Sequence, residues 1–444
     1  MKIELSGHYG YRRLLMSSLP SMAMMIIASM YSIVDGIFVS NYVGLTPFAG
    51  LNLVWPAIVV IGAMGFMVGT GGSAIVSMML GQRDLEKANR TFTSLVAFIA
   101  IVAVVFAVPM YIFMPDIVSL LGANTPEISR NAVIYGRICS IGLPAYMLQV
   151  AFQSFFMAAE KPELGTKLSI ASGVTNIALD ALFIIVFKWG LAGAAAASMI
   201  GCAVGGFFPV WYFKYRRKDG ELRLTRIQFD KKVIAHTCLN GSSEYIGNVA
   251  FSLVSICYNL QLIKYYGESG IAAYSVIMYI GFIFAAIYSG YNLTVGPVVA
   301  FNYGAGNTDE LKNLLRKSIK LLFALGAGMV IIAQLIAKPV SMLFVGHDAA
   351  TLELTVKAVR IYMFSFLISG VNMFVSAWFT GLGNGPISAV SAFSRSLIFE
   401  LGAVFALPLL LGADGIWFSV IYAEAASFIL CMLLLYKFRK RYSY

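Results

Sequence analysis

Twelve apolar runs, each about 20 residues or longer, follow one another along this chain of 444 residues. A helix of about 20 apolar residues is long enough to cross the roughly 30 Å hydrocarbon core of a lipid bilayer. The runs therefore predict an all-α, polytopic membrane protein with twelve transmembrane helices. They lie near residues 14–40, 48–80, 92–114, 131–158, 165–187, 190–213, 233–264, 270–303, 315–337, 354–380, 387–411 and 414–436.

The distribution of charge predicts how these helices are oriented. Only 12% of the residues are charged, against about 25% in soluble proteins. Most of the 32 Lys and Arg residues fall in the N-terminus, the C-terminus and the loops that follow even-numbered runs. Because basic loops stay on the cytoplasmic side, we expect a cell-membrane protein with both termini in the cytoplasm. This bias accounts for the net charge of +11, so we expect no nucleic-acid partner.

The two halves of the chain resemble each other. GQRDLEK after the second run is similar to GNTDELK after the eighth, which pairs Gly81 with Gly306 and Asp84 with Asp309. Because six spans is an even number, both halves keep the same orientation in the membrane. We therefore expect two six-helix lobes related by a pseudo-two-fold axis along the membrane normal, with a cavity between them. The expected boundaries are residues 1–213 for the first lobe, 214–232 for a basic cytoplasmic linker and 233–444 for the second lobe.

Two aspartates interrupt apolar runs of the first half. Asp35 lies in the first run and Asp180 in the fifth, although an aspartate at the bilayer centre costs about 2.5–3.5 kcal/mol. At about 1.5 Å per residue, both lie roughly 10 Å from the outer ends of their spans. Asn176 is one turn from Asp180 on the same helix face, and Ser198 reaches a similar depth in the sixth span. The four side chains therefore predict one polar site.

The chemistry of these four side chains favours a cation. Two adjacent carboxylates cannot both ionise cheaply, so they need either a shared proton or a bound cation. Asp35, Asp180 and Asn176, with the Ser198 hydroxyl, offer oxygen ligands of the kind that Na⁺ prefers. We expect a coupling-ion site for H⁺ or Na⁺ and no other cofactor. Interhelical hydrogen bonding without ion binding is the structural alternative.

Further embedded polar residues occur in the second half. Glu244, Glu400 and Glu424 lie near the middle of spans seven, eleven and twelve, and we regard them, with Asn292 in span eight, as candidates for coupling or substrate binding. Glu400 and Glu424 could instead pair with Ser or Tyr, and Arg395 is a candidate partner for Glu400 or a cytoplasm-facing residue. Five aromatic residues are candidates for contact with planar cations through their ring faces: Tyr274, Tyr279, Tyr288, Tyr291 and Trp378.

Two stretches of the first half carry a family resemblance. TNIALDALFIIVFKWGLAGAAAAS, residues 175–198, resembles the fifth-to-sixth span signature of multidrug and toxic compound extrusion (MATE) transporters, and MYSIVDGIFVSNYVG, residues 30–44, resembles their first-span motif. Ser198 stands where family members often have threonine. The resemblance implies a V-shaped, two-lobe exporter that exchanges Na⁺ or H⁺ for amphipathic, often cationic, compounds by alternating access. It also implies ion coupling at Asp35 and Asp180, and matches Glu244 to a seventh-span acid.

Other functions fit the sequence less well. A flippase for lipid-linked oligosaccharides has the same wider architecture, but a pyrophosphate cargo favours a cationic cavity, and the embedded charges here are mostly acidic. The chain has no phosphate-binding loop of an ATP-driven pump. The embedded carboxylates have no His or Cys partners at one depth, so we do not expect an enzyme. We expect a monomer in the lipid bilayer that binds small amphipathic or cationic substrates.

Overall fold

The computed structural model describes residues 4–123, 125–215, 222–346 and 348–444, and these residues form helices and connecting loops without a β-strand. In the first half the helices are α1 (Tyr11–Phe38), η1 (Val39–Val43), α2 (Leu45–Gly81), α3 (Leu85–Ile112), α4 (Met114–Leu120), α5 (Pro126–Ala158), α6 (Pro162–Asp180), η2 (Ala181–Val186) and α7 (Gly190–Tyr215). In the second half they are α8 (Lys231–Asn240), α9 (Ser242–Gly304), α10 (Thr308–Val345), α11 (Ala349–Tyr362), η3 (Met363–Ser365), α12 (Phe366–Gly381), α13 (Gly385–Phe393), η4 (Ser394–Glu400), α14 (Leu401–Leu411) and α15 (Gly415–Tyr442).

Twelve spans are present, although the described residues form 11 continuous helical stretches that are long and apolar enough to cross a membrane. The difference lies in α9, which has 63 residues and breaks at Gly267, where φ is 63° and ψ is −147°. A straight helix of that length would measure about 95 Å, far more than one bilayer core. Gly267 adopts a positive φ without the steric cost of a Cβ, so the seventh and eighth predicted spans follow each other without a loop.

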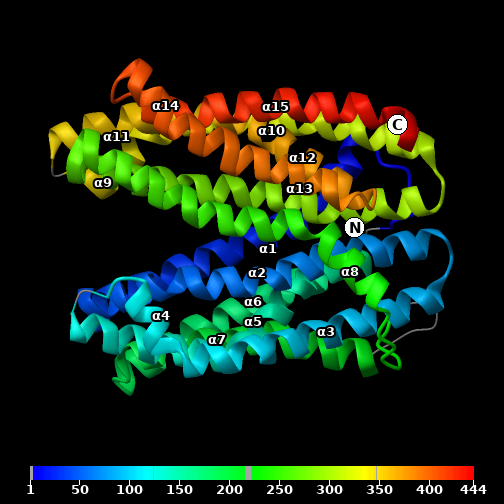
Figure 1. The fold of residues 1–444 in the computed structure, drawn as a ribbon, viewed down its shortest axis with the longest axis horizontal. Helices are drawn as coiled ribbons and strands as arrows, with labels where there is room; N and C mark the ends of the chain where they lie inside the picture. The colour runs from blue at the N-terminus through cyan, green and yellow to red at the C-terminus, as the bar shows by residue number, and fades with distance from the viewer. Residues whose placement is uncertain (1–3, 124, 216–221, 347) are drawn as a thin grey trace.

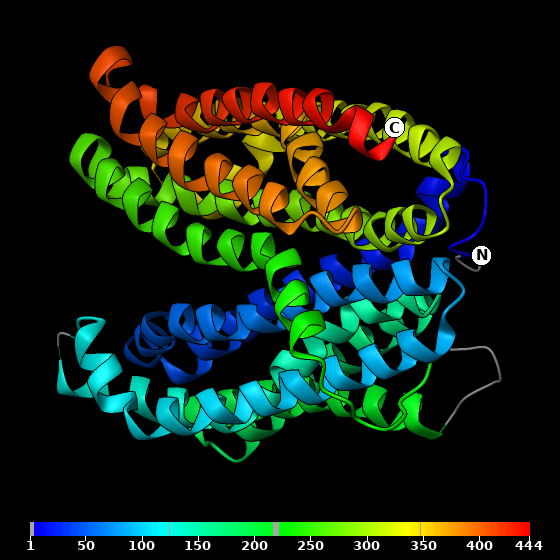
Figure 2. The ribbon, with the colours of Figure 1, turned by 45° about the vertical axis from the view of Figure 1, so that its right-hand side comes forward.

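The helices form two bundles, one from α1–α7 and one from α9–α15, with α8 crossing between them (Figure 1). The bundles are close together at the end that holds both chain termini and diverge toward the other end (Figure 2). Part of the expected linker, residues 216–221, lies outside the described residues. The molecule is therefore a two-bundle, all-α membrane protein, as the apolar runs predict.

Glycine residues bring the backbones of the two bundles into contact at the end near the termini. A Cβ on Gly81 would overlap with the carbonyl oxygen of Phe301, and a Cβ on Gly304 would overlap with that of Met78. Gly241 separates α8 from α9 within the predicted span 233–264, and its Cβ would collide with the Met67 carbonyl oxygen. We call this contact of α2 with α8 and α9 the glycine seam.

The helix caps correct the register of the internal repeat. Asp84 caps α3 by accepting from the Lys87 amide, and Asn307 caps α10 by accepting from the Glu310 amide. The structure therefore matches Asp84 with Asn307, and the seam matches Gly81 with Gly304. The predicted pairing of Asp84 with Asp309 is displaced by two residues. The predicted pairing aligned the two Gly-x-x-Asp motifs by residue identity. The structurally equivalent positions are instead those that cap the two helices.

Candidate functional site

Asp35 and Asp180 lie next to irregular turns of their helices. The backbone changes from α-helix to π-helix at Ala181, directly after Asp180, and at Val39, one turn after Asp35. Such π-helical turns are rare and occur mostly at functional sites, because they change which residues share a face. Both aspartates thus lie at points where their helices depart from regular α-helical geometry.

The structure brings the four side chains of the predicted polar site together in the first bundle. Asp180 is fully buried, at 0% exposure, and Asn176 is 2% exposed. The Asn176 amide nitrogen donates to the Ser198 hydroxyl oxygen at 3.2 Å. The Asp35 and Asp180 carboxyl groups are near enough to share a hydrogen bond if one of them carries a proton. Their depths, estimated from the sequence, therefore correspond to a real proximity.

Four side-chain oxygens of this cluster have no hydrogen-bond donor among the described residues. Asp35 Oδ1, Asn176 Oδ1 and both carboxyl oxygens of Asp180 are buried without a hydrogen-bond partner among the described residues. A buried acceptor without a partner costs about 1–3 kcal/mol, and more if it is charged. A proton between the carboxylates or a cation held by these oxygens would remove that cost. These oxygen ligands suit a hard cation such as Na⁺, which is bound by carboxylate and carbonyl oxygens.

Neighbouring helices supply residues that the sequence analysis did not identify. Tyr135 and Cys139 of α5 and Cys202 of α7 lie close enough to Asp35 to interact with charge on its carboxyl group. All three are buried. They lie on helices without an embedded acid, so nothing in the sequence indicates that they are near Asp35.

A second site lies between the two bundles. A cavity of about 420 Å³ falls within the 300–1,000 Å³ typical of pockets for drug-sized ligands. The first bundle contributes side chains from α1, α2 and α5, among them Met25, Thr70 and Gln153. The second bundle supplies most of the wall, including the four candidates Glu244, Asn292, Glu400 and Glu424. All four second-half candidates therefore face one cavity, separate from the Asp35 and Asp180 pair.

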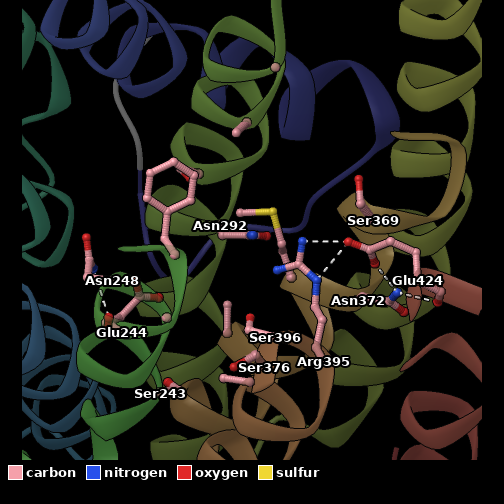
Figure 3. A pocket seen from close by; sticks show the side chains of 18 of the residues that line it. Ser243, Glu244, Asn248, Asn292, Ser369, Asn372, Ser376, Arg395, Ser396 and Glu424 are labelled. Carbon is pink, nitrogen blue, oxygen red and sulfur yellow. Dashed lines mark hydrogen bonds and ion pairs between the residues drawn. The ribbon is translucent and has the colours of Figure 1, made fainter. Parts of the chain in front are cut away.

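One ion pair dominates the polar wall of this cavity (Figure 3). Arg395 Nε and Nη2 donate to Glu424 Oε1 at 2.9 and 2.7 Å. The Asn372 amide nitrogen donates to Glu424 Oε2 at 2.6 Å and to the Glu424 carbonyl oxygen at 2.9 Å. From the sequence, Ser or Tyr is a candidate structural partner of Glu424, and Arg395 is a candidate partner of Glu400 or a cytoplasm-facing residue. In the structure Asn372 and Arg395 are the partners of Glu424, and Glu400 lies within electrostatic reach of Arg395 without being its hydrogen-bond partner.

Glu244 and Glu400 are differently placed. The Glu400 carboxyl lies within electrostatic reach of Arg395 and Glu424. The Glu244 carbonyl oxygen accepts from the Asn248 amide nitrogen at 2.8 Å, and its carboxyl group has no charged neighbour among the described residues. Figure 3 shows Glu244 on the opposite side of the pocket from Arg395 and Glu424. Asn292 Oδ1 is also buried without a partner within the described part of the chain. The cavity thus presents the carboxyl groups of Glu244 and Glu400 and an Asn292 amide oxygen without a hydrogen-bond partner.

Most of the candidate aromatic residues do not reach this cavity. Tyr274 contributes to its wall. Tyr291 is fully buried and donates to the Ser318 hydroxyl at 2.7 Å, and Tyr288 donates to the Phe366 carbonyl oxygen at 2.5 Å. Trp378 is fully buried among aromatic rings, whereas Tyr279 is 39% exposed and stacks on Phe344. These four do not line the cavity, and their contacts are those of packing or surface residues.

Comparison with known proteins agrees with this architecture. A solved structure of a multidrug resistance MATE family transporter in an outward-facing conformation superposes with a TM-score of 0.91, at 22% identity, over 99% of this chain and 97% of that one. Multidrug export protein MepA of Staphylococcus haemolyticus is 23% identical over 94% of this chain and 92% of its own. MepA of Staphylococcus aureus strain N315 is 22% identical over 97% and 94%, respectively.

Two helical bundles around a central polar cavity define a transporter architecture. The model of the MatE family matches residues 20–182 and 245–404, one match in each half. This chain belongs to the MatE family, the MATE transporters that the resemblance implied. It is a multi-pass membrane protein, and the two matches repeat the duplication that the sequence motifs indicate.

Proposed function

We propose that this protein is a secondary active exporter of the cell membrane that exchanges amphipathic, cationic small molecules for H⁺ or Na⁺. The observation that carries the proposal is the pair of carboxyl groups of Asp35 and Asp180, of which Asp35 Oδ1 and both Asp180 oxygens are buried without a hydrogen-bond partner among the described residues. Such a pair changes its charge state when it binds or releases a cation, and this change can bias the conformation of the helices that hold it. Asn176 and Ser198 complete the proposed coupling site.

The cargo class follows from the central cavity. Its described lining contains three carboxylates and a single basic side chain, Arg395, which is already paired with Glu424. This charge balance suits organic cations and disfavours the pyrophosphate of a lipid-linked oligosaccharide, the alternative cargo. The names of the MepA relatives describe multidrug export, which supports the same class. We propose a monomer without a cofactor other than the coupling ion.

The bundles diverge at the end away from the termini (Figure 2). With both termini in the cytoplasm, as the basic residues indicate, this end faces the outside. Export by alternating access then requires the glycine seam to open toward the cytoplasm in a second conformation. The coupling ion would favour one of the two conformations by binding it more tightly.

Ethidium efflux from inverted vesicles, with a Na⁺ gradient and a pH gradient imposed separately, tests transport and identifies the ion. Asp35→Asn and Asp180→Asn should each abolish gradient-driven transport, because an amide neither carries a proton at this site nor neutralises a cation. Asp116→Asn, at an exposed position of α4, is the matched control and should transport normally. Normal transport by either variant of the buried pair would refute the coupling assignment, provided that it inserts at the wild-type level.

A further inference from the structure

Arg395 lies on a segment whose geometry brings it next to a second carboxylate. It belongs to the π-helical segment η4, Ser394–Glu400, in which backbone hydrogen bonds join residues five apart. Arg395 and Glu400 are five residues apart, so they share a face here, whereas in an α-helix they would not. Both residues line the cavity. The guanidinium therefore has one carboxylate that it contacts, Glu424, and another within electrostatic reach, Glu400.

The Arg395–Glu424 contact borders the cavity, and Asn372 fixes Glu424 on the side away from the cavity. Asn372 orients Glu424 from the bundle side through its amide nitrogen, and Arg395 takes Oε1 on the other side. The Arg395 side chain is 28% exposed, against 6% for Glu424. The carboxylate is thus fixed in place, whereas the cation that covers it borders open space.

The same wall contains polar atoms that have no hydrogen-bond partner among the described residues. Asn372 Oδ1 and the Ser369 hydroxyl have no hydrogen-bond partner there, although these residues are 1% and 4% exposed. Both residues line the cavity beside Glu424. Buried polar atoms are almost always satisfied, so their position indicates a ligand group that approaches Glu424 from the cavity. A carboxylate flanked by free acceptors suits a cation, especially one that also carries N–H groups.

We propose that Arg395 is a resident counter-cation of the cavity, and that it sets the charge selectivity of substrate binding. A cationic substrate competes with the guanidinium for Glu424, and Arg395 moves toward Glu400 without becoming an unpaired buried charge, which would be costly. When all three carboxyl groups are ionised, they exceed the one guanidinium by two negative charges, which are available to the substrate. This inference rests on the proposed function and adds the residue that limits how much positive charge the cavity accepts.

The test compares two dyes that share one ring system, ethidium with one positive charge and propidium with two. Their Kd values are measured by fluorescence anisotropy on the full-length, detergent-purified protein. Arg395→Gln removes a repulsive charge, and a dication gains about twice as much binding free energy as a monocation. At the distances within one pocket, this should raise the preference for propidium over ethidium by roughly tenfold or more. Arg395→Lys should keep the wild-type preference.

A purely structural ion pair makes a different prediction. Glu424→Gln leaves Arg395 without its partner and should lower the preference for propidium, opposite in sign to Arg395→Gln. If the pair only stabilises the bundle, both variants weaken the binding of both dyes in the same direction, and the inference is wrong. The charge-balanced Arg395→Gln, Glu424→Gln double variant should lie near the wild type, which separates charge selectivity from misfolding. Arg360→Gln, on an exposed position of α11, changes net charge equally and should change neither Kd.

The same measurements distinguish this inference from the proposed function. A wild-type protein that binds neither dye contradicts export of organic cations, and the role of Arg395 is refuted with it. A wild-type protein that binds and exports ethidium, with an unchanged dye preference in Arg395→Gln, leaves the proposed function intact. That result would refute Arg395 as the determinant of charge selectivity.

Discussion

At the scale of single residues, Asp414 shows how one carboxylate joins three helices at the diverging end of the second bundle. Its Oδ2 accepts from Lys357 Nζ of α11 at 2.6 Å, and its Oδ1 accepts from the Tyr266 hydroxyl of α9 at 2.9 Å. Asp414 itself precedes the first turn of α15. The hydrogen bond from Lys357 lowers the pKa of the Asp414 carboxyl below its ordinary value.

Asp414→Asn should therefore lower the melting temperature in detergent, by an amount that corresponds to at most about 1 kcal/mol because the side chain is 39% exposed. A carboxyl whose pKa is lowered by folding stabilises the protein above the unfolded pKa of about 3.9. This contribution is lost as the pH falls through the lowered folded pKa. The melting temperatures of wild type and variant should differ at pH 7 and converge at an acidic pH below that lowered pKa.

The control for this prediction is Asp116→Asn, an exposed position, which should leave the melting temperature unchanged at both pH values. A difference between wild type and Asp414→Asn that grows on acidification would contradict the assigned ion pair.

At the scale of elements, the segment before α1 is better ordered than its polar composition indicates. Leu5 and Tyr9 are buried, at 2% and 0% exposure. The Leu5 amide donates to Glu160 Oε1 at 2.6 Å, after the end of α5 in the first bundle. The Tyr9 amide donates to Glu310 Oε1 at 2.9 Å, and His8 Nδ1 lies 2.6 Å from Glu310 Oε2, on α10 of the second bundle. The segment thus bridges the two bundles beside the glycine seam.

Glu310→Ala should release this segment, because it removes the acceptor of the Tyr9 amide and the partner of His8 at once. Losing a buried partner costs about 1–3 kcal/mol, so the amides of residues 5–9 should exchange hydrogen roughly tenfold faster or more by mass spectrometry. Asp309→Ala is the matched control, because that side chain is 97% exposed. Equal protection of the segment in wild type and Glu310→Ala would show that this bridge does not hold it.

At the scale of the whole molecule, the glycine seam determines how closely the bundles approach. Gly81 and Gly304 face backbone carbonyl groups, which cannot move aside as a flexible side chain would. An added methyl group must therefore push the helices apart, and overpacking of this kind costs about 1–3 kcal/mol. Because the same cost is absent when the seam is open, it changes the balance between conformations by roughly 5- to 150-fold.

Gly81→Ala should accordingly populate a conformation in which the bundles are separated at the terminal end. Spin labels at the exposed positions Gln82 and Ala305 would report this as a longer distance by double electron–electron resonance. Gly296→Ala is the control, because a Cβ there meets nothing within 4 Å, and its distance distribution should match that of the wild type. An unchanged distribution in Gly81→Ala would indicate that the seam does not limit the approach of the bundles.

Features that depend on one contiguous segment of the chain could be predicted from the sequence, whereas contacts between distant helices could not. Asp35, Asn176, Asp180 and Ser198 could be placed together because their spans have known directions and helix rise converts residue counts into depth. The partner of Arg395 could not be found in this way. The π-helical turn of η4 changes which residues share a face, and Glu424 reaches Arg395 from a helix 29 residues further along the chain. The sequence also could not show which aromatic residues face the cavity, because hydrophobic periodicity is weak in helices that are apolar on all sides.

The sequence by itself determined the membrane location, the number of spans, the duplication and the depth of the first acid pair. These properties depend on the length and polarity of contiguous segments, which the bilayer selects one helix at a time. Only the tertiary structure decided that Asp35 approaches Tyr135, that Arg395 holds Glu424, and that glycines bring α2 against α9. These contacts depend on the rotation and crossing of helices packed against one another, and that packing is set by side-chain shape across bundles.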